Sequence, residues 1–209
     1  MRGTALRADA ASSVSRILDA AHGALVAGGA ASLTRIAEEA GVGAATLYRH
    51  FPNRQVLARA VYQRVFTQTV EPLILRLEDC DGDHDSLVHI LERVGAVFTR
   101  ERRLMASVEN VGPLTDDLIA RHDALFDALA RRGQAAGHFR GDLDGRDLAR
   151  LLCVIALGAG ALAEDAEQRH RMIETLLDAL RPLPAESPDG VAPGTEDAAS
   201  ALPPHRIAG

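Results

Sequence analysis

Apolar residues recur at helical spacing along most of the chain. The first run comprises Val14, Ile17, Leu18, Ala21 and Leu25. These positions fall on one face of a helix, with Ser12 or Ser13 as the expected N-cap and Gly28-Gly29 as the stop. No segment alternates apolar and polar residues with a period of two, so the pattern predicts an all-α fold of about nine helices.

Three shorter helices are expected after Gly29. The first runs from residue 33 or 34 to 40 and stops at Gly41, and the second runs from 44 to 50. Asn53 is suited to cap the third and longer one, because its side chain can accept a hydrogen bond from a backbone N–H of the first turn. Pro72 is expected to break or bend the chain after that helix, since proline lacks an N–H.

The rest of the pattern predicts a larger helical body. An acidic loop over residues 79–85 precedes a helix that carries Leu87 to Phe98. Further helices are expected over residues 102–110, 114–136, 145–163 and 166–181.

These elements suggest four parts. Residues 1–11 are expected to be a flexible arm, 12–66 a small head, 67–181 a body, and 182–209 a disordered tail. The tail is rich in proline, glycine and acidic residues, a composition that cannot build a packed core.

The segment Ser32–Phe51, SLTRIAEEAGVGAATLYRHF, has the features of a helix-turn-helix. Two short helices that cross closely need a small residue at the crossing, which Ala37 provides, and Gly41 tolerates the left-handed backbone of a tight turn. Apolar side chains expected to face the rest of the head are Ile36, Ala40, Val42 and Leu47. The second helix would then be free to enter a major groove of DNA with Ala44, Ala45, Tyr48 and Arg49 exposed.

Charge is distributed unevenly between the head and the remainder. The net charge is −6, but residues 1–66 hold eight arginines against four acidic residues, and the remainder holds 15 arginines against 25. A basic head on an acidic body is typical of a phosphate-binding module attached to a separate domain. Chance fluctuation over a short segment explains the same imbalance, so charge alone leaves both interpretations open.

The helix-turn-helix segment resembles that of the TetR-type regulators. The family pattern is present as Thr34, Ile36-Ala37, Ala40-Gly41-Val42, Thr46-Leu47-Tyr48, His50-Phe51, and Arg54 before Val56-Leu57. Gly43 departs from it, because the family commonly has serine or threonine there to cap the second helix. A hydroxyl contact with phosphate is lost at Gly43, although backbone N–H groups at the helix start can still bind phosphate.

This resemblance implies a role for each exposed residue of the head. Thr46, Tyr48 and His50 would contact DNA phosphates with support from Arg54. Base reading would fall to Thr34 or Arg35, to Ala44 and Ala45, and to Arg49, whose guanidinium suits a guanine edge. Three alternatives stay open: Tyr48 as a core aromatic, His50 as an ordinary surface histidine, and Arg35 as a solvated helix charge.

In the same family, a C-terminal helical domain holds a small-molecule pocket, and two long final helices pair with a second copy. The expected dimer interface comprises Leu152, Ile155, Ala159, Leu176 and Leu180. Small residues at 156 and 158–160 would allow a close approach there. The alternative is that these helices complete the core of a single chain.

An effector pocket would use polar or aromatic residues within otherwise apolar helices. The candidates are Phe98, Met105, Glu109, Asn110, His122 and Phe126. Each of them could instead be an ordinary core or surface residue. His84, His89 and the acidic loop match no established metal-binding loop, so a solvated turn is expected there, without metal or cofactor.

Other protein classes have no support in the sequence. Cys80 and Cys153 have neither metal-binding nor redox spacing, and there is no nucleophile elbow, phosphate-binding glycine loop or pair of metal ligands. The longest stretch without a charged residue or histidine, residues 151–163, is too short to cross a bilayer, and the start of the chain does not resemble a signal peptide. We therefore expect a cytoplasmic protein that is not an enzyme and has no membrane partner.

Together these expectations describe a repressor. A homodimer would bind a palindromic operator in double-stranded DNA, since two-fold symmetry lets two heads read half-sites about 34–36 Å apart. An unidentified small-molecule effector would favour an arrangement that cannot bind DNA, and so release the operator. Three alternatives stay open: an activator, an architectural DNA-binding protein without a ligand, and an enzyme with an accessory DNA-binding head.

Overall fold

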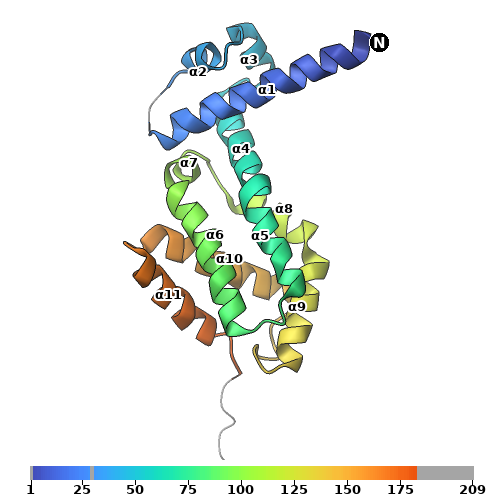
Figure 1. The fold of residues 1–209 in the computed structure, drawn as a ribbon, viewed down its shortest axis with the longest axis vertical. Coiled ribbons are helices and arrows are strands. Elements are labelled where there is room, and N and C mark those ends of the chain that lie inside the picture. Colours follow the sequence, from blue (N-terminus) through green and yellow to red (C-terminus); the bar gives the residue numbers. More distant parts are fainter. Residues whose placement is uncertain (1, 29–30, 183–209) are drawn as a thin grey trace, which may run out of the picture.

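The computed structural model describes residues 2–28 and 31–182, with side chains from residue 11 onward. Every regular element in these ranges is helical, which confirms the predicted all-α fold. Figure 1 shows a small head at one end of the molecule, a larger body at the other, and a long helical segment that joins them. The tail predicted to be disordered lies, from residue 183 onward, outside the described residues.

The head contains α1 (Arg2–Val26), α2 (Leu33–Glu39), α3 (Ala44–His50) and α4 (Arg54–Val65). Two of its helices have side-chain N-caps, of which Asn53 was predicted and Ser32 was not. The Ser32 hydroxyl accepts a hydrogen bond from the Arg35 N–H at 3.2 Å, and Asn53 Oδ1 accepts one from the Val56 N–H at 2.9 Å. Both helices therefore begin where a side chain satisfies a first-turn donor.

The first helix is longer than the apolar pattern predicts. Residues 1–11 are expected to be an arm and Ser12 or Ser13 the N-cap, but α1 begins at Arg2, and both serines lie inside it. Residues 2–11 contain four alanines and no proline, so helix propensity extends the helix where no apolar face is required. In Figure 1 this end of α1 projects beyond the rest of the head.

Pro72 does not end the helical path from the head to the body. α4 continues into a π-helical turn, η1 (Phe66–Val70), then α5 (Glu71–Leu75) and a 3-10 turn, η2 (Arg76–Asp79). Pro72 lies in the first turn of α5, where the missing N–H costs least. The wider π-helical turn absorbs the irregularity that the sequence predicts as a break.

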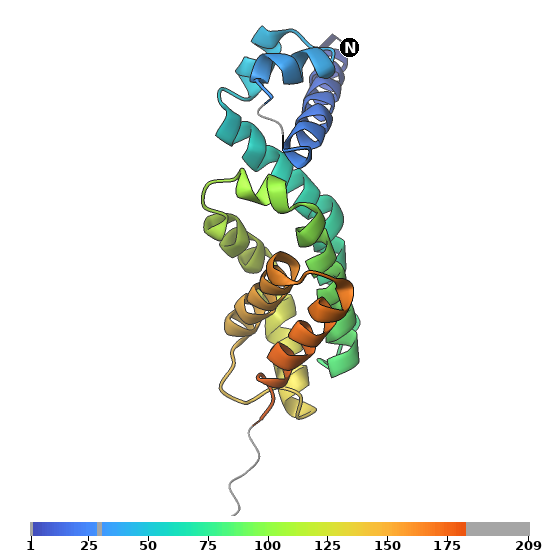
Figure 2. The ribbon, with the colours of Figure 1, turned by 90° about the vertical axis from the view of Figure 1, so that its left-hand side faces the viewer.

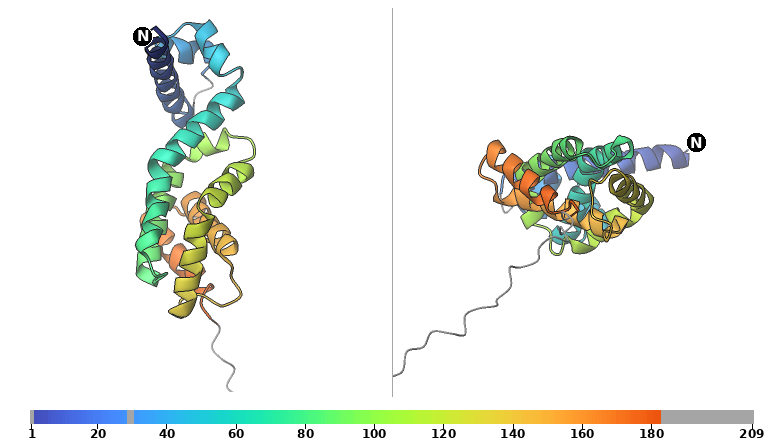
Figure 3. Two further views of the ribbon diagram at one scale, coloured as in Figure 1. Left: turned by 90° about the vertical axis from the view of Figure 1, so that its right-hand side faces the viewer. Right: turned by 90° about the horizontal axis from the view of Figure 1, so that it is seen from below.

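The body contains α6 (His84–Arg100), α7 (Arg102–Ala106), α8 (Gly112–Arg121), α9 (Asp123–Ala135), α10 (Gly145–Leu162) and α11 (Ala166–Asp178). α10 is its central helix and packs against α6, α9 and α11. Figure 2 shows α10 and α11 together on one side of the body, and the left view of Figure 3 shows α8 and α9 on the opposite side. The single helix predicted over 114–136 is divided at His122, which ends α8.

The acidic loop before α6 is held by one arginine. Arg132 Nη2 donates hydrogen bonds to the carbonyl oxygens of Leu77, Glu78 and Cys80 at 3.0, 3.1 and 2.8 Å. Arg132 Nε also lies 3.4 Å from Asp81 Oδ1. The Arg132 guanidinium therefore offsets part of the negative charge of this loop.

Candidate nucleic-acid interface

α2 and α3 form the predicted helix-turn-helix. Gly41 has a φ of +63°, and its N–H donates to the Glu38 carbonyl at 3.0 Å, while the Val42 N–H donates to the Ala37 carbonyl at 3.0 Å. These bonds close the turn, and the left-handed backbone explains why glycine occupies it. Of the side chains predicted to face inward, Ile36, Ala40 and Leu47 are buried in the head core and Val42 is half-buried against it. The small crossing residue Ala37 is buried as well.

The outer face of α3 carries the residues expected to meet DNA. Ala44, Ala45 and Arg49 are exposed, and Tyr48 is 47% exposed, so it is not a core aromatic. Within the part of the chain whose side chains are described, Arg49 makes no hydrogen bond or ion pair. Its guanidinium can therefore bind a partner without breaking a contact inside the protein.

Three other positions in or next to α3 differ from these exposed residues. Gly43 is the N-cap of α3 and makes no side-chain hydrogen bond, as its sequence departure predicts, and Thr46 is half-buried. His50 is also half-buried, and its Nε2 atom is enclosed with no hydrogen-bond partner among the described residues. A phosphate could bind this nitrogen only if the ring turned outward.

Three predicted contact residues flank α3. Thr34 and Arg35 are exposed on α2, and Arg35 Nε lies 3.5 Å from Glu39 Oε1, one turn later. Arg54 Nη1 donates a 2.6 Å hydrogen bond to the Ala31 carbonyl oxygen. Arg54 therefore ties the start of α4 to the segment before α2, a structural role that no sequence signal indicates.

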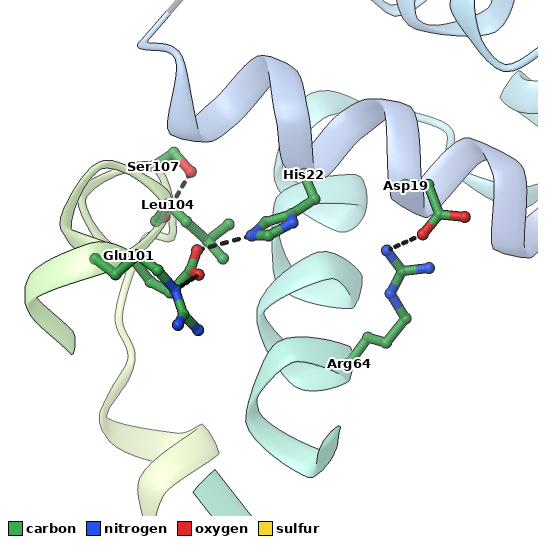
Figure 4. Close-up of polar contacts among 7 residues, drawn as sticks. Asp19, His22, Arg64, Glu101, Leu104 and Ser107 are labelled. Carbon is green, nitrogen blue, oxygen red and sulfur yellow. Dashed lines mark hydrogen bonds and ion pairs between the residues drawn. The ribbon is translucent and has the colours of Figure 1, made fainter. Parts of the chain in front are cut away.

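A polar network joins the head to the body (Figure 4). Glu101, at the end of α6, is only 3% exposed. Its Oε2 atom lies 2.7 Å from His22 Nε2 of α1, and Arg100 Nε donates to its Oε1 atom at 3.0 Å. Burial alone would raise the pKa of Glu101, but the hydrogen bonds and charges of His22 and Arg100 outweigh it and hold the pKa below the ordinary 4.5.

Other contacts strengthen the same junction. Arg103 Nη1 donates to the carbonyl oxygens of Val26 and Ala27, at 3.3 and 2.9 Å, and so caps the end of α1. Leu104, Val108 and Leu114 belong to the hydrophobic core of the head although they follow α6 in the chain. The boundary expected near residue 66 therefore does not separate the two cores, because later residues return to complete the head.

Comparison with known families identifies the helix-turn-helix region. The family model described as "Bacterial regulatory proteins, tetR family" matches residues 17–61, from the middle of α1 into α4. The helix-turn-helix region of the chain therefore has the sequence pattern of a family of bacterial regulatory proteins.

Solved structures resemble most of the chain. NalD, the secondary repressor of the MexAB-OprM multidrug efflux pump in Pseudomonas aeruginosa, is 22% identical with a TM-score of 0.56 over 83% of this chain and 98% of its own. Its likeness shows that the body also has the tetR-family fold.

Two other regulators are similar in sequence over most of the chain. A TetR transcriptional regulator from Streptomyces coelicolor is 28% identical over 81% of this chain and 98% of its own, with a TM-score of 0.49. A TetR transcription regulatory protein from Mycobacterium vanbaalenii is 26% identical over 85% and 99%, with a TM-score of 0.48. No curated protein sequence matches the chain.

Two other kinds of feature are absent from the described residues. Among the residues that the structure describes, no helix is long and apolar enough to span a bilayer. The described side chains also contain no cluster of three or more histidine, cysteine or acidic residues placed to hold a metal ion.

Most residues predicted to form a dimer interface are buried within one chain. Leu152, Ile155, Ala159 and Leu180 are each at most 5% exposed, whereas Leu176 is 41% exposed. The prediction is wrong for the four buried residues because their faces of α10 and α11 complete the body core. Gly160 allows α6 to pack closely, because a Cβ atom there would lie 2.6 Å from the Gly95 carbonyl oxygen, whereas a Cβ atom at Gly158 would meet open space.

A cavity of about 50 Å³ lies in the body core, and only two predicted pocket residues, Phe98 and Phe126, line it. Met105 instead packs at the junction of the two cores, and His122 Nε2 lies 2.8 Å from Glu71 Oε1. Glu109 and Asn110 are exposed. The sequence missed the other lining residues because aliphatic side chains such as Val94 and Leu118 look like ordinary core.

Proposed function

We propose that this protein represses transcription in the cytoplasm as a homodimer that binds a palindromic operator and releases it when a small molecule binds the body. The observation that carries the proposal is the outer face of α3, where exposed Tyr48 and unpartnered Arg49 lie on a helix-turn-helix whose other face is buried. A short exposed recognition helix of this kind fits the major groove.

Within this proposal the residues of the head divide into two groups. Thr46 and Tyr48 contact phosphates and set the position of the head, and Gly43 lets the backbone approach closely. His50 joins these contacts when its ring turns outward. Arg49 reads a guanine edge, Ala44 and Ala45 touch thymine methyl groups, and Thr34 or Arg35 reaches a further base. Arg54 supports these contacts indirectly, because its bond to Ala31 positions α4 against the segment before α2.

Exposed apolar side chains on the last two helices support a homodimer. Val154 and Leu162 of α10 are 64% and 71% exposed, and Leu176 of α11 is 41% exposed. These two helices lie side by side on one face of the body in Figure 2. An apolar surface of this kind on paired helices favours burial against the same surface of a second copy, which has the two-fold symmetry of a palindromic site.

The cavity supports a response to a small molecule. Its lining includes Phe66 and Val70 of η1, which continues directly from α4 of the head. A ligand that fits best when η1 and α6 have moved would favour an arrangement of the two heads that no longer matches successive major grooves. Binding and operator release would then be coupled through α4.

Selection from random DNA duplexes tests the DNA-binding part of the proposal. We expect a palindromic motif, and Arg49→Ala should weaken its preference at one base pair of each half-site by about tenfold. Tyr48→Ala should weaken binding to all duplexes by a similar factor, because a phosphate contact carries no sequence information. Arg131→Ala, which removes an exposed charge from the body, is the matched control, and an effect equal to that of Arg49→Ala would contradict base reading.

The mass of the protein in solution tests the dimer. Val154→Asp and Leu162→Asp should produce monomers in light scattering and abolish tight operator binding. Leu75→Asp introduces the same charge at a side chain that is 42% exposed on α5 and should leave the dimer intact. A protein that is monomeric before any substitution would refute this part of the proposal.

A further inference from the structure

A groove on the surface of the body lies next to the apolar cavity. It measures about 490 Å³ and runs between α4 with η1 on one side and α8 on the other. Gln63, Thr67, Asp117 and Arg121 give it a polar lining. Phe66 lines both the groove and the cavity, so its ring separates solvent from the interior at this point.

Phe66 forms the wall between the two spaces, and Tyr62, which lines the groove, packs against it. Their ring centroids are 5.9 Å apart, and the rings are tilted by 34°. Tyr62 is 7% exposed, and its hydroxyl has a hydrogen bond with Thr115 of α8. The wall is therefore attached to α8 through one polar contact, and Phe66 itself is half-buried.

The interior behind this wall disfavours charge. Burial raises the pKa of Tyr62 to about 12 and that of Cys153 to about 11, so both groups stay neutral at physiological pH. Apart from the Cys153 thiol, the cavity is lined by aliphatic and phenyl side chains. A charged group entering it would lose its hydration without finding a partner.

The backbone under the wall is suited to movement. Phe66 begins the π-helical turn η1, and Pro72, which has no N–H to bond back into that turn, follows shortly after it. π-Helical turns are rare and occur frequently at functional sites. A change of local register there would move Phe66 with few backbone hydrogen bonds to break.

We propose that the Tyr62–Phe66 pair is the entrance to the cavity and that it admits a small uncharged amphiphile from the groove between α4 and α8. The apolar part of the molecule lies in the cavity, and its single polar group replaces or joins the contact between Tyr62 and Thr115, near the Cys153 thiol. The closed cavity has room for on the order of four water-sized groups, so longer molecules require Phe66 to move. The inference rests on the proposed ligand response, since it names the class of molecule that the same cavity senses.

A tryptophan reporter tests this entrance, because the chain contains no tryptophan. Phe66→Trp places the fluorophore in the wall, and Leu75→Trp places one at an exposed site on α5 as the matched control. The probes are the primary alcohols from 1-butanol to 1-octanol, and the carboxylates and alkylammonium ions of the same lengths at pH 7. We expect a saturable change in emission for Phe66→Trp with the alcohols, binding at least about tenfold tighter than the ions, and no saturable change for Leu75→Trp.

A second variant keeps the test independent of the reporter. Phe66→Ala should extend the preference to longer alcohols, measured as a larger rise in melting temperature with 1-octanol than the unsubstituted protein shows. If Phe66→Trp does not fold, the melting temperature of the unsubstituted protein with the alcohols and with the ions tests the same preference. Ions that bind as tightly as alcohols, or equal responses of the two tryptophans, would overturn the proposal.

Operator binding with and without 1-hexanol separates this inference from the proposed function. Saturable alcohol binding that leaves operator affinity unchanged would support the entrance and contradict the ligand-released repressor. Operator binding by a protein whose cavity takes up none of the probes would overturn the entrance and leave the DNA-binding role standing.

Discussion

The head and the body bury similar side chains in different ways. Leu47 of α3 and Leu148 of α10 are both completely inaccessible to solvent. Leu47 lies in a core built mainly from residues 17–62, whereas Leu148 belongs to a body core that gathers residues from 70 to 180. The comparison teaches why a short motif is recognisable in the head: its helices, turn and outward face depend on residues close together in sequence.

The contacts between the head and the body make the head less independent than its local sequence pattern suggests. Leu104, Val108 and Leu114 enter the head core from the far end of α6 and beyond, and Glu101 fixes α1 through His22. The head is therefore local in its pattern but depends on the body for part of its packing. A change in α6 can reach α1 directly through these contacts.

The largest effect should come from removing the same side chain from each core. Leu47→Ala and Leu148→Ala should each lower the free energy of unfolding by about 3 kcal/mol, because each leaves a cavity in a fully packed site. Leu47→Ala should also weaken operator binding strongly, since Leu47 anchors α3. Leu148→Ala should leave operator affinity nearly unchanged at temperatures where the variant is folded.

Chemical denaturation and DNA titration of both variants measure this difference. Operator affinity reduced equally by the two substitutions would mean that the head has no structural independence from the body.

A smaller effect is expected at the junction. Glu101→Ala should cost about 2 kcal/mol, because it removes charged hydrogen bonds but leaves two partners that solvent can reach. Glu92 forms a similar 2.8 Å contact with His170 at the body surface, so Glu92→Ala is the matched control and should change the melting temperature little. Similar losses of stability for the two variants would contradict the importance of burial at Glu101.

The junction also predicts a dependence on pH. Because the pKa of Glu101 is lowered in the folded protein, its unfolded form binds a proton first as the pH falls. The stabilisation is complete above the ordinary value of 4.5 and is lost as the pH falls through the lower folded value. The stability difference between the native protein and Glu101→Gln, followed by denaturation at several pH values, should therefore shrink on acidification. A difference that grows at low pH would reverse this assignment.

The smallest effect is expected at two glycines with left-handed backbones. Gly41 in the head has a φ of +63°, and Gly137 in the body has a φ of +76°. Neither would suffer a steric clash from an added Cβ atom, so Gly41→Ala and Gly137→Ala should each cost about 1 kcal/mol through backbone strain alone. Operator affinity should fall only for Gly41→Ala, because that turn sets the angle of α3. A weaker operator complex with Gly137→Ala would show that the body turn also positions the heads.

The sequence predicted the fold class, the N-cap Asn53, the turn at Gly41 and the exposed face of α3. It did not predict the N-cap Ser32, the burial of Leu152, Ile155, Ala159 and Leu180, or the enclosed Nε2 atom of His50. The predicted features depend on neighbours within a few residues in the sequence. The unpredicted ones depend mainly on which helix packs over a given face.

By itself, the sequence determined the helices and the helix-turn-helix, because helical periodicity, capping side chains and glycine turns act over a few residues. Only the tertiary structure decided that Leu104, Val108 and Leu114 complete the head core, that Glu101 is buried against His22, and that Val154 and Leu162 stay exposed. The physical reason is that burial depends on segments brought together from distant parts of the chain. The sequence of an amphipathic helix does not indicate whether an aliphatic residue on it will be covered by its own chain, by a ligand or by a second copy.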